Sequence, residues 1–293
     1  MPRNLANLAC ALSVLVVITA CMCKPDRNKE NSAPTPANSF SKGSSPSPTA
    51  TQSSSSSSKR ADSGDFLVEH ESVKTAKYME IDRQVRSEKL LENAADKLNA
   101  ALILPHDITL KSAECGEINA FYKPEDPSVT VCFELMEHFY NTFRSSGDSE
   151  DKAYTKMFNA VRFVFLHEVG HALIDTFSLP VTGNEEDAAD RCSAYINIEE
   201  LGQDGVDAVL AAAEAFQIES KHSGTGRRDL ADEHLLQEQR FYNSLCMLYG
   251  SDPSKYTSIL TEGFLPKERA VRCQNEYQRT RDSWTSLLEP WRK

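Results

Sequence analysis

The sequence predicts an α+β domain in which a small antiparallel sheet or hairpin comes first and a mostly helical region follows. Two short apolar runs at 118–123 and 129–135 flank the turn residues 124–127, which is the pattern of a hairpin. A helix is expected at about 87–102, and strands are expected near 107–135. Helices are expected in the part of the chain that follows these strands.

The segment 154–174 is expected to be a buried helix, because aliphatic and aromatic residues dominate it, and Asp151 is its expected N-cap. A His-Glu-x-x-His motif occupies 167–171 within this helix. Glu168, the acid of the motif, is turned toward the open side of any metal held by the two histidines, where it can act as a general base. Gly170 lowers helix propensity by about 1 kcal/mol relative to Ala, which indicates that another segment passes close to the helix.

The motif is typical of a hydrolytic zinc site. His167 and His171 are four residues apart, so that they share one face of a helix and can bind one zinc ion at roughly 2.0–2.1 Å. Catalytic zinc usually takes a third protein ligand. Asp175 is badly placed for this role, because it lies about 12 Å along the helix axis from His167. The metzincin pattern is excluded, since Ile174 and Phe177 stand where it needs Gly and His.

Turn residues at 179–184 end this helix, and an acidic sequence at 185–190 begins a second one. A carboxylate in the first turn of a returning helix can reach a metal on the first helix. Glu186 and Asp190 are four residues apart and share a face, so one could bind the ion while the other accepts the N–H of a ligand imidazole. An acidic first turn that only stabilises its helix is the other interpretation.

The E-x-x-A-D spacing resembles the third-ligand helix of gluzincins. This resemblance implies that Glu186 is the third zinc ligand and Asp190 the orienting carboxylate, with Glu185 as the alternative ligand. A wider resemblance rests on the segments 115–122, 131–135, 167–175, 185–190, 239–243 with Cys246, 249–253, and 272–273 through 283–284. Through these segments, residues 66–293 resemble a bacterial metallopeptidase family of unknown function, which implies a zincin-like fold, a zinc cofactor and a peptide or protein substrate.

Peptide hydrolysis also needs a group that stabilises the oxyanion. His234 is the candidate and Tyr242 the alternative, although the stronger interpretation of His234 is a surface residue on a charged helix face. The competing function is a non-catalytic envelope lipoprotein or binding module with a structural zinc site. Glu168 argues against it, because a structural site has no use for an acid between its ligands.

The first residues resemble a bacterial lipoprotein signal peptide. Residues 1–20 combine Arg3 with an apolar run at 8–20, and Ile-Thr-Ala precedes Cys21 as in a lipobox. Cleavage before Cys21 would leave a lipidated N-terminus anchored to the membrane, on the extracytoplasmic side of the bacterial envelope. An ordinary secretory signal is the alternative. Residues 21–65 are then the lipidated N-terminus and a disordered Ser-, Pro- and Thr-rich tether, which leaves 66–293 as the metallopeptidase domain.

The chain is acidic, with a formal net charge of −11 over 293 residues. Nucleic acids and anionic lipid headgroups repel such a protein. We therefore expect no nucleic-acid partner, and a membrane contact that depends on the lipid anchor.

Cysteine usage predicts an oxidising compartment. Cys115 and Cys132 flank the hairpin and are expected to form a disulfide, although the turn would set Cys132 opposite residue 119, so that a bend at Gly116 is needed. Cys246 and Cys273 are the expected second pair. The alternative is that all of these cysteines are small buried hydrophobic residues.

We predict that Cys21→Ser moves the protein from the membrane fraction to the soluble fraction, because acyl chains attached to this residue would provide the anchor. Detergent phase partitioning measures the change. A wild-type protein that already partitions into the aqueous phase would show that no lipid anchor exists.

Overall fold

The computed structural model describes residues 60–222, 226 and 230–293. The predicted signal peptide, the lipidation site Cys21 and most of the predicted tether lie outside the described residues. The predictions about them therefore stay predictions.

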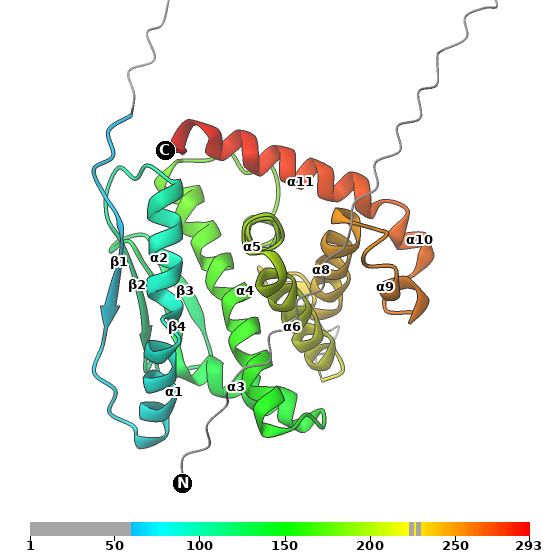
Figure 1. The fold of residues 1–293 in the computed structure, drawn as a ribbon, viewed down its shortest axis with the longest axis horizontal. Coiled ribbons are helices and arrows are strands. Elements are labelled where there is room, and N and C mark those ends of the chain that lie inside the picture. The colour runs from blue at the N-terminus through cyan, green and yellow to red at the C-terminus, as the bar shows by residue number, and fades with distance from the viewer. Residues whose placement is uncertain (1–59, 223–225, 227–229) are drawn as a thin grey trace, which may run out of the picture. The chain divides into compact units, whose positions relative to one another are not determined.

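The described chain is α+β, with one small sheet and a mostly helical remainder (Figure 1). The sheet has four strands in the order β1-β2-β4-β3. Their bounds are β1 Phe66–His70, β2 Ile108–Ala113, β3 Ala120–Lys123 and β4 Ser128–Cys132. The prediction of an antiparallel sheet is wrong for three of the four strands, because β1, β2 and β4 run parallel and only β3 pairs antiparallel, with β4. The parallel pairing requires the helical crossover between β1 and β2.

Helices account for most of the remaining chain. Their bounds are α1 Ala76–Ser87, α2 Leu90–Ala101, α3 Phe133–Ser145, α4 Glu150–Thr176, α5 Glu185–Glu200, α6 Gly202–Ser220, α8 Gln237–Ser251, α9 Ser258–Thr261, α10 Lys267–Ala270, α11 Cys273–Leu288 and the 3-10 turn η1 Glu289–Trp291. The helix expected at 87–102 is α2, and it begins later because Lys89 adopts a left-handed conformation with φ of 50°. In the described part of the chain, no helix combines the length and the apolar character that crossing a membrane requires.

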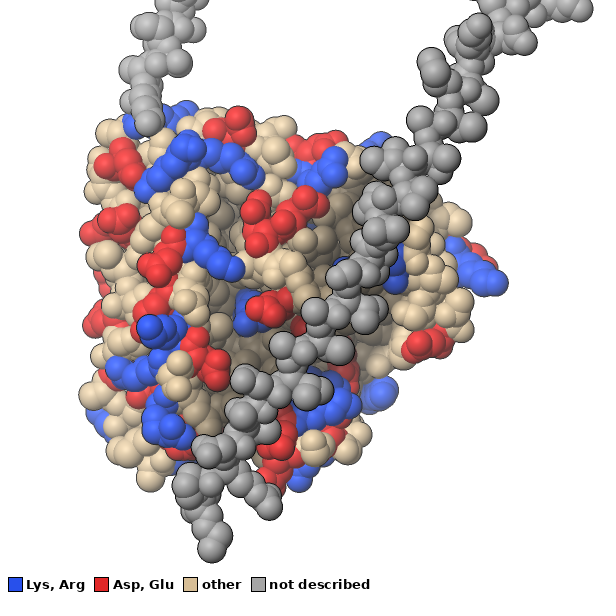
Figure 2. All heavy atoms as spheres, in the orientation of Figure 1, with Lys and Arg blue, Asp and Glu red and all other residues tan. Residues whose placement is uncertain are grey.

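Acidic and basic side chains intermix on the face of the domain that α1 and α2 cover (Figure 2). Part of this mixture follows from helical spacing, since Arg83 pairs with Glu80 and Arg86 pairs with Asp82 on successive turns of α1. Such exposed pairs contribute less than about 1 kcal/mol each. This face therefore carries a balanced charge.

The predicted hairpin is confirmed in β3 and β4. The N–H of Cys132 donates to the carbonyl oxygen of Asn119, so these two residues face each other as the turn length predicted. Gly116 supplies the bend with φ of +78°, and the Cys115–Cys132 disulfide forms across it. The second strand is shorter than predicted, because α3 starts directly after Cys132.

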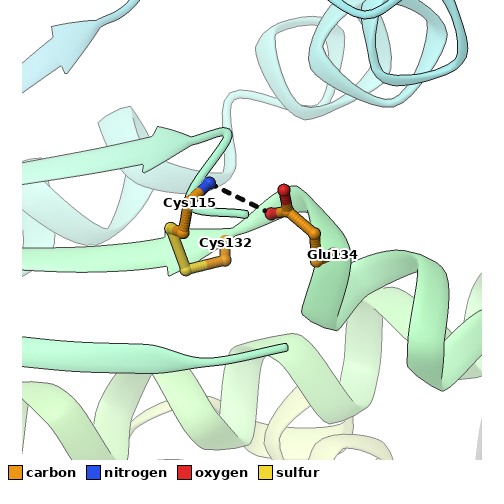
Figure 3. A group of neighbouring side chains, drawn as sticks. All are labelled: Cys115, Cys132 and Glu134. Carbon is orange, nitrogen blue, oxygen red and sulfur yellow. Dashed lines mark hydrogen bonds between the residues drawn. A yellow bond between two sulfur atoms is a disulfide. The ribbon is translucent and has the colours of Figure 1, made fainter. Parts of the chain in front are cut away.

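The carboxylate of Glu134, in the first turn of α3, closes this corner (Figure 3). It accepts hydrogen bonds from the backbone N–H groups of Cys115 and Gly116, at 3.2 Å and 2.8 Å. These bonds hold the pKa of Glu134 below its usual range, although burial of the carboxyl opposes the shift. The loop that leads into β3 is thus fixed by both the Cys115–Cys132 disulfide and the carboxylate of Glu134.

The second predicted disulfide is also confirmed, between Cys246 on α8 and Cys273 at the start of α11. Cys192 on α5 is the free cysteine among the described residues, and it is buried.

Helix α4 lies at the centre of the domain (Figure 1). It packs against β3 and β4 on the sheet side and against α5 and α6 on the other side. Its N-cap is Ser149, whose hydroxyl accepts the N–H of Lys152, and not Asp151 as predicted. Apolar residues of α4 contribute to the core on the sheet side, whereas Phe163 belongs to a second apolar cluster with α6, α8 and α11. This double packing explains why most of the helix is buried.

Helix α5 crosses α4 at Gly170. This confirms the close approach of another segment that a glycine inside the helix indicated. A Cβ at position 170 would lie 3.1 Å from the Cβ of Cys192 and 3.2 Å from the Cα of Ala189. Helix α6 approaches α5 even more closely, since a Cβ at Gly205 would lie 1.8 Å from the carbonyl oxygen of Asn197.

We predict that Gly205→Ala lowers the free energy of unfolding by about 2 kcal/mol or more. The clash with a backbone atom should exceed the gain in helix propensity, which is about 1 kcal/mol. Urea denaturation measures the difference. The matched control is Gly183→Ala, where a Cβ would meet nothing within 4 Å and the change should stay within about 0.5 kcal/mol. Equal effects at the two positions would contradict the proposed close approach.

Candidate metal centre

A cleft of about 900 Å³ lies between β3 and the central helices. Helix α4 contributes His167, Glu168 and His171 to its wall, and α5 contributes Glu185 and Glu186 in its first turn. The turn between the two helices reverses the chain, and this reversal brings the acidic first turn of α5 beside the imidazoles. The structure therefore gathers the predicted metal-binding residues in one place.

Three ligand atoms converge at this point. Nε2 of His167 lies 3.1 Å from Oε2 of Glu186 and 3.2 Å from Nε2 of His171. Nε2 of His171 lies 3.4 Å from the same oxygen of Glu186. Tetrahedral zinc with bonds of about 2.0–2.1 Å would set its ligand atoms about 3.3–3.4 Å apart. The observed spacings fit such an ion.

The opposite nitrogen of each imidazole faces a carboxylate. Nδ1 of His167 lies 2.9 Å from Asp190, and Nδ1 of His171 lies 2.8 Å from Glu185. A carboxylate accepts hydrogen bonds, so each Nδ1 is the donor, and in the neutral imidazole each Nε2 then carries the lone pair. Both lone pairs point toward the Glu186 oxygen and thus toward a position that favours a cation.

The pKa values of the cluster also indicate a position that favours a cation. Burial disfavours a positive charge on His167, but its hydrogen bonds with Asp190 and Glu186 outweigh burial and raise the pKa of His167 to about 9. Contacts with the three histidines hold the pKa of Glu186 far below its usual range, against the effect of burial. The cluster is rich in negative charge and is compensated by either protons or a metal ion.

Asp190 is anchored by an arginine that the sequence motifs did not reveal. Arg240 on α8 donates from Nε and Nη2 to the two carboxylate oxygens of Asp190, at 2.8 Å and 2.7 Å. Burial opposes the charge of Asp190, but Arg240 and His167 outweigh it and hold the pKa of Asp190 below its usual range. A cation in the stretch 240–248, which contains no other charged residue, is the signal in the sequence that could have indicated this role.

Glu168 is buried beside the cluster, with 7% of its surface exposed. Burial raises the pKa of Glu168, although the neighbouring histidines and a hydrogen bond from the backbone of Tyr122 lower it. A carboxyl whose pKa is moved toward neutrality is suited to general-base chemistry. The hydroxyl of Tyr122 also donates to Asp175 at 2.8 Å. Strand β3 is therefore hydrogen-bonded to α4 at Glu168, before His171, and at Asp175, after it.

His234 lies at the mouth of the cleft. Its Nε2 is 2.9 Å from Oε2 of Glu186, and its ring stacks on His167 at a centroid distance of 5.8 Å. His234 belongs to the segment before α8 and not to a charged helix face, which was the other interpretation of this residue. Tyr242, the alternative oxyanion group, packs against the second apolar cluster and not along the cleft.

A second group of potential ligands, Cys115, Cys132 and Glu134, lies at the corner shown in Figure 3. Its two sulfur atoms are joined in a disulfide, and the carboxylate of Glu134 already accepts two backbone N–H groups. This group is therefore structural.

We predict that His167→Ala and Glu186→Ala each abolish stoichiometric zinc binding, whereas Glu185→Ala retains the metal. Asp190→Asn should weaken zinc affinity about 10–100-fold, because it removes the acceptor that orients His167 without removing a ligand. Elemental analysis and competition with a chelator measure these changes. If Glu185→Ala empties the site and Glu186→Ala leaves it full, the ligand assignment is wrong by one residue.

One of the comparisons with known proteins finds a match. No curated protein and no solved structure match the chain significantly. A family model described as "Putative metallopeptidase" matches residues 70–288, which is more than half of the chain. The chain therefore belongs to this metallopeptidase family.

Proposed function

We propose that this protein is a zinc-dependent peptidase that hydrolyses peptide bonds outside the cytoplasm. The observation that carries the proposal is the convergence of His167, His171 and Glu186 on one point beside the buried acid Glu168. The cleft that contains them is large enough for several peptide residues. The arrangement of these residues on two consecutive helices is similar to that in gluzincins, and we assign the protein a zincin-like fold on this basis.

In this proposal His167, His171 and Glu186 hold the zinc ion. When bound, zinc lowers the pKa of its water to about 7 and polarises the substrate carbonyl. Glu168 takes the proton of the attacking water and can return it to the leaving amine. Because Glu168 is buried and its pKa is raised, its affinity for that proton is greater than that of an exposed glutamate.

Three outer residues keep the imidazoles in place. Asp190 and Glu185 each accept the Nδ1 hydrogen of one histidine, and Arg240 fixes Asp190. These contacts orient both Nε2 atoms toward the metal position and make the imidazoles stronger ligands. Glu185 thus acts in the same manner as Asp190 and does not compete with Glu186.

The role of His234 differs between the two functions that the site permits. As a donor at the mouth of the cleft, it would stabilise the oxyanion, and we favour this role because 46% of its side chain is exposed. As a fourth zinc ligand, beside His167 and Glu186, it would close the site and favour the alternative function of a non-catalytic envelope binding module. Glu168 and the open cleft support the peptidase.

Strand β3 offers a backbone surface for an extended substrate. It is one of the two edge strands of the sheet, and residues 118–122 line the cleft. Asn119 pairs with β4, whereas the backbone of Tyr122 bonds to Glu168, so Ala120 and Tyr122 turn their backbone groups toward the cleft. A peptide can add to such an edge by β-augmentation. Its scissile bond would then lie next to Glu168.

We also propose that the peptidase acts at the extracytoplasmic side of a bacterial membrane, held there by a lipid on Cys21. The two disulfides support an oxidising compartment. A secreted, unanchored form is the alternative. The net charge of −11 argues against a nucleic-acid partner.

We predict that Glu168→Gln keeps bound zinc and thermal stability but lowers peptide hydrolysis by about 10²–10⁴-fold, because a positioned general base is lost. Library screening with the zinc-loaded wild type provides the substrate, and both proteins are compared at equal zinc content.

The outcome distinguishes enzyme from binding module. If the fully loaded wild type cuts nothing in a broad peptide library, and Glu168→Gln preserves the cellular role of the protein, the structural-zinc function replaces the peptidase.

A further inference from the structure

His234 reaches the metal centre from a segment without regular structure. The segment 231–236 directly precedes α8 and forms neither helix nor strand. Nε2 of His234 lies 2.9 Å from Oε2 of Glu186, while 46% of its side chain is exposed. Within the segment, the carboxylate of Asp232 accepts the backbone N–H of His234 at 2.9 Å. That bond shapes the segment but does not attach it to the rest of the domain, because both residues belong to it.

The contact with Glu186 cannot by itself hold His234 in the proposed enzyme. The same oxygen of Glu186 lies 3.1 Å from Nε2 of His167 and is the atom assigned to the metal. Once this oxygen binds a metal ion, it shares its negative charge with the ion and becomes a weaker acceptor for His234. A second attachment of the segment is therefore required to keep His234 at the mouth of the cleft.

Asn184 provides such an attachment. It is the N-cap of α5, and its Oδ1 accepts the backbone N–H of Asp187 at 3.1 Å. Its Nδ2 donates to the backbone carbonyl oxygen of Glu233 at 2.7 Å, directly before His234. These partners fix the orientation of the amide, because the reversed amide would set donor against donor and acceptor against acceptor. One side chain thus joins the first turn of α5, which carries Glu186, to the segment that carries His234.

The capping of α5 does not by itself require an amide. Asp, Ser and Asn are all good N-caps, since each offers an oxygen to the backbone N–H groups of the first turn. Asn differs from Asp because the same side chain also carries N–H donors on a second atom. Asn184→Asp therefore keeps a capping oxygen but replaces the donor with an oxygen, which repels the carbonyl of Glu233. The two hydrogen bonds of Asn184 can be separated in this way.

We infer that Asn184 is a positioning residue that holds His234 at the metal centre through its hydrogen bond with Glu233. The inference rests on the proposed peptidase function, in which His234 donates a hydrogen bond to the oxyanion. Because the oxyanion forms only in the transition state, a displaced His234 lowers kcat and leaves KM nearly unchanged. The distance between His234 and Glu186 is thus set by one side chain at the start of α5.

Steady-state kinetics of zinc-loaded variants test the inference. Asn184→Asp should lower kcat roughly 3–10-fold, as expected for one lost hydrogen bond, with KM, zinc content and thermal stability unchanged. Asn184→Ser should have the same effect without adding a charge, because serine caps the helix but is too short to reach Glu233 as well. The matched control is Ser149→Asp, which exchanges the N-cap of α4 at the end of that helix remote from His167 and should leave the kinetics unchanged.

A double-mutant cycle distinguishes positioning from a general structural role. His234→Ala removes the group through which Asn184 acts, so Asn184→Asp should cause no further loss of kcat in the His234→Ala background. An equal loss in both backgrounds overturns the inference. A loss of kcat that is explained by lower zinc content or lower thermal stability also overturns it, because capping of α5 would then account for the effect.

Chemical labelling makes the test independent of turnover. The rate at which diethyl pyrocarbonate modifies His234, followed by mass spectrometry, should rise roughly 3-fold or more in Asn184→Ser and stay unchanged in Ser149→Asp. An unchanged rate in Asn184→Ser overturns the role of Asn184, whether or not the protein cuts peptides. A wild type that cuts nothing overturns the peptidase, and the labelling rate then decides whether Asn184 holds His234 in place.

Discussion

The close contact of α5 with α4 at Gly170 is the constraint on which the site depends. Without a Cβ at this position, the backbone of α5 at Ala189 can approach the helix that carries both histidines. That approach fixes the distance from the histidines to the α5 carboxylates on either side of Ala189. A longer separation would leave Glu186 and Asp190 unable to reach opposite nitrogens of His167. The glycine inside the motif thus contributes geometry and not chemistry.

The short interhelical distance creates an electrostatic problem that the rest of the domain compensates. Glu186 and Asp190 are largely withdrawn from water beside Glu168, and buried carboxylates require opposite charges or hydrogen bonds. Arg240 compensates Asp190 from α8, and a cation held between the imidazoles in the proposed metal site would compensate Glu186. Helix α8 is itself held by α6 and by the disulfide to α11. The C-terminal helices therefore support the metal centre although none of them carries a predicted ligand.

The sequence predicted the features that local spacing determines. Two histidines four apart must share a helical face, and the turn length sets Cys132 opposite Asn119, so both features are present in the structure. It did not predict the parallel pairing of Phe66–His70, because a five-residue strand carries little signal and its partner lies far along the chain. Nor did it predict Arg240 on Asp190, since that contact depends on how α8 crosses α5.

The acidity of the cleft connects the metal centre with the choice of substrate. Carboxylates surround the imidazoles on both sides, and Asp175, Glu219 and Glu233 extend this negative lining along the cleft. A peptide carbonyl is itself an acceptor, and the cleft offers it the donors of His234, Asn119 and Ser178. In the proposed peptidase, a metal ion held by the imidazoles would be a further group that attracts the carbonyl oxygen. A polyanion would be repelled by this lining. The same carboxylates therefore favour a cation at the imidazoles and disfavour a polyanionic substrate.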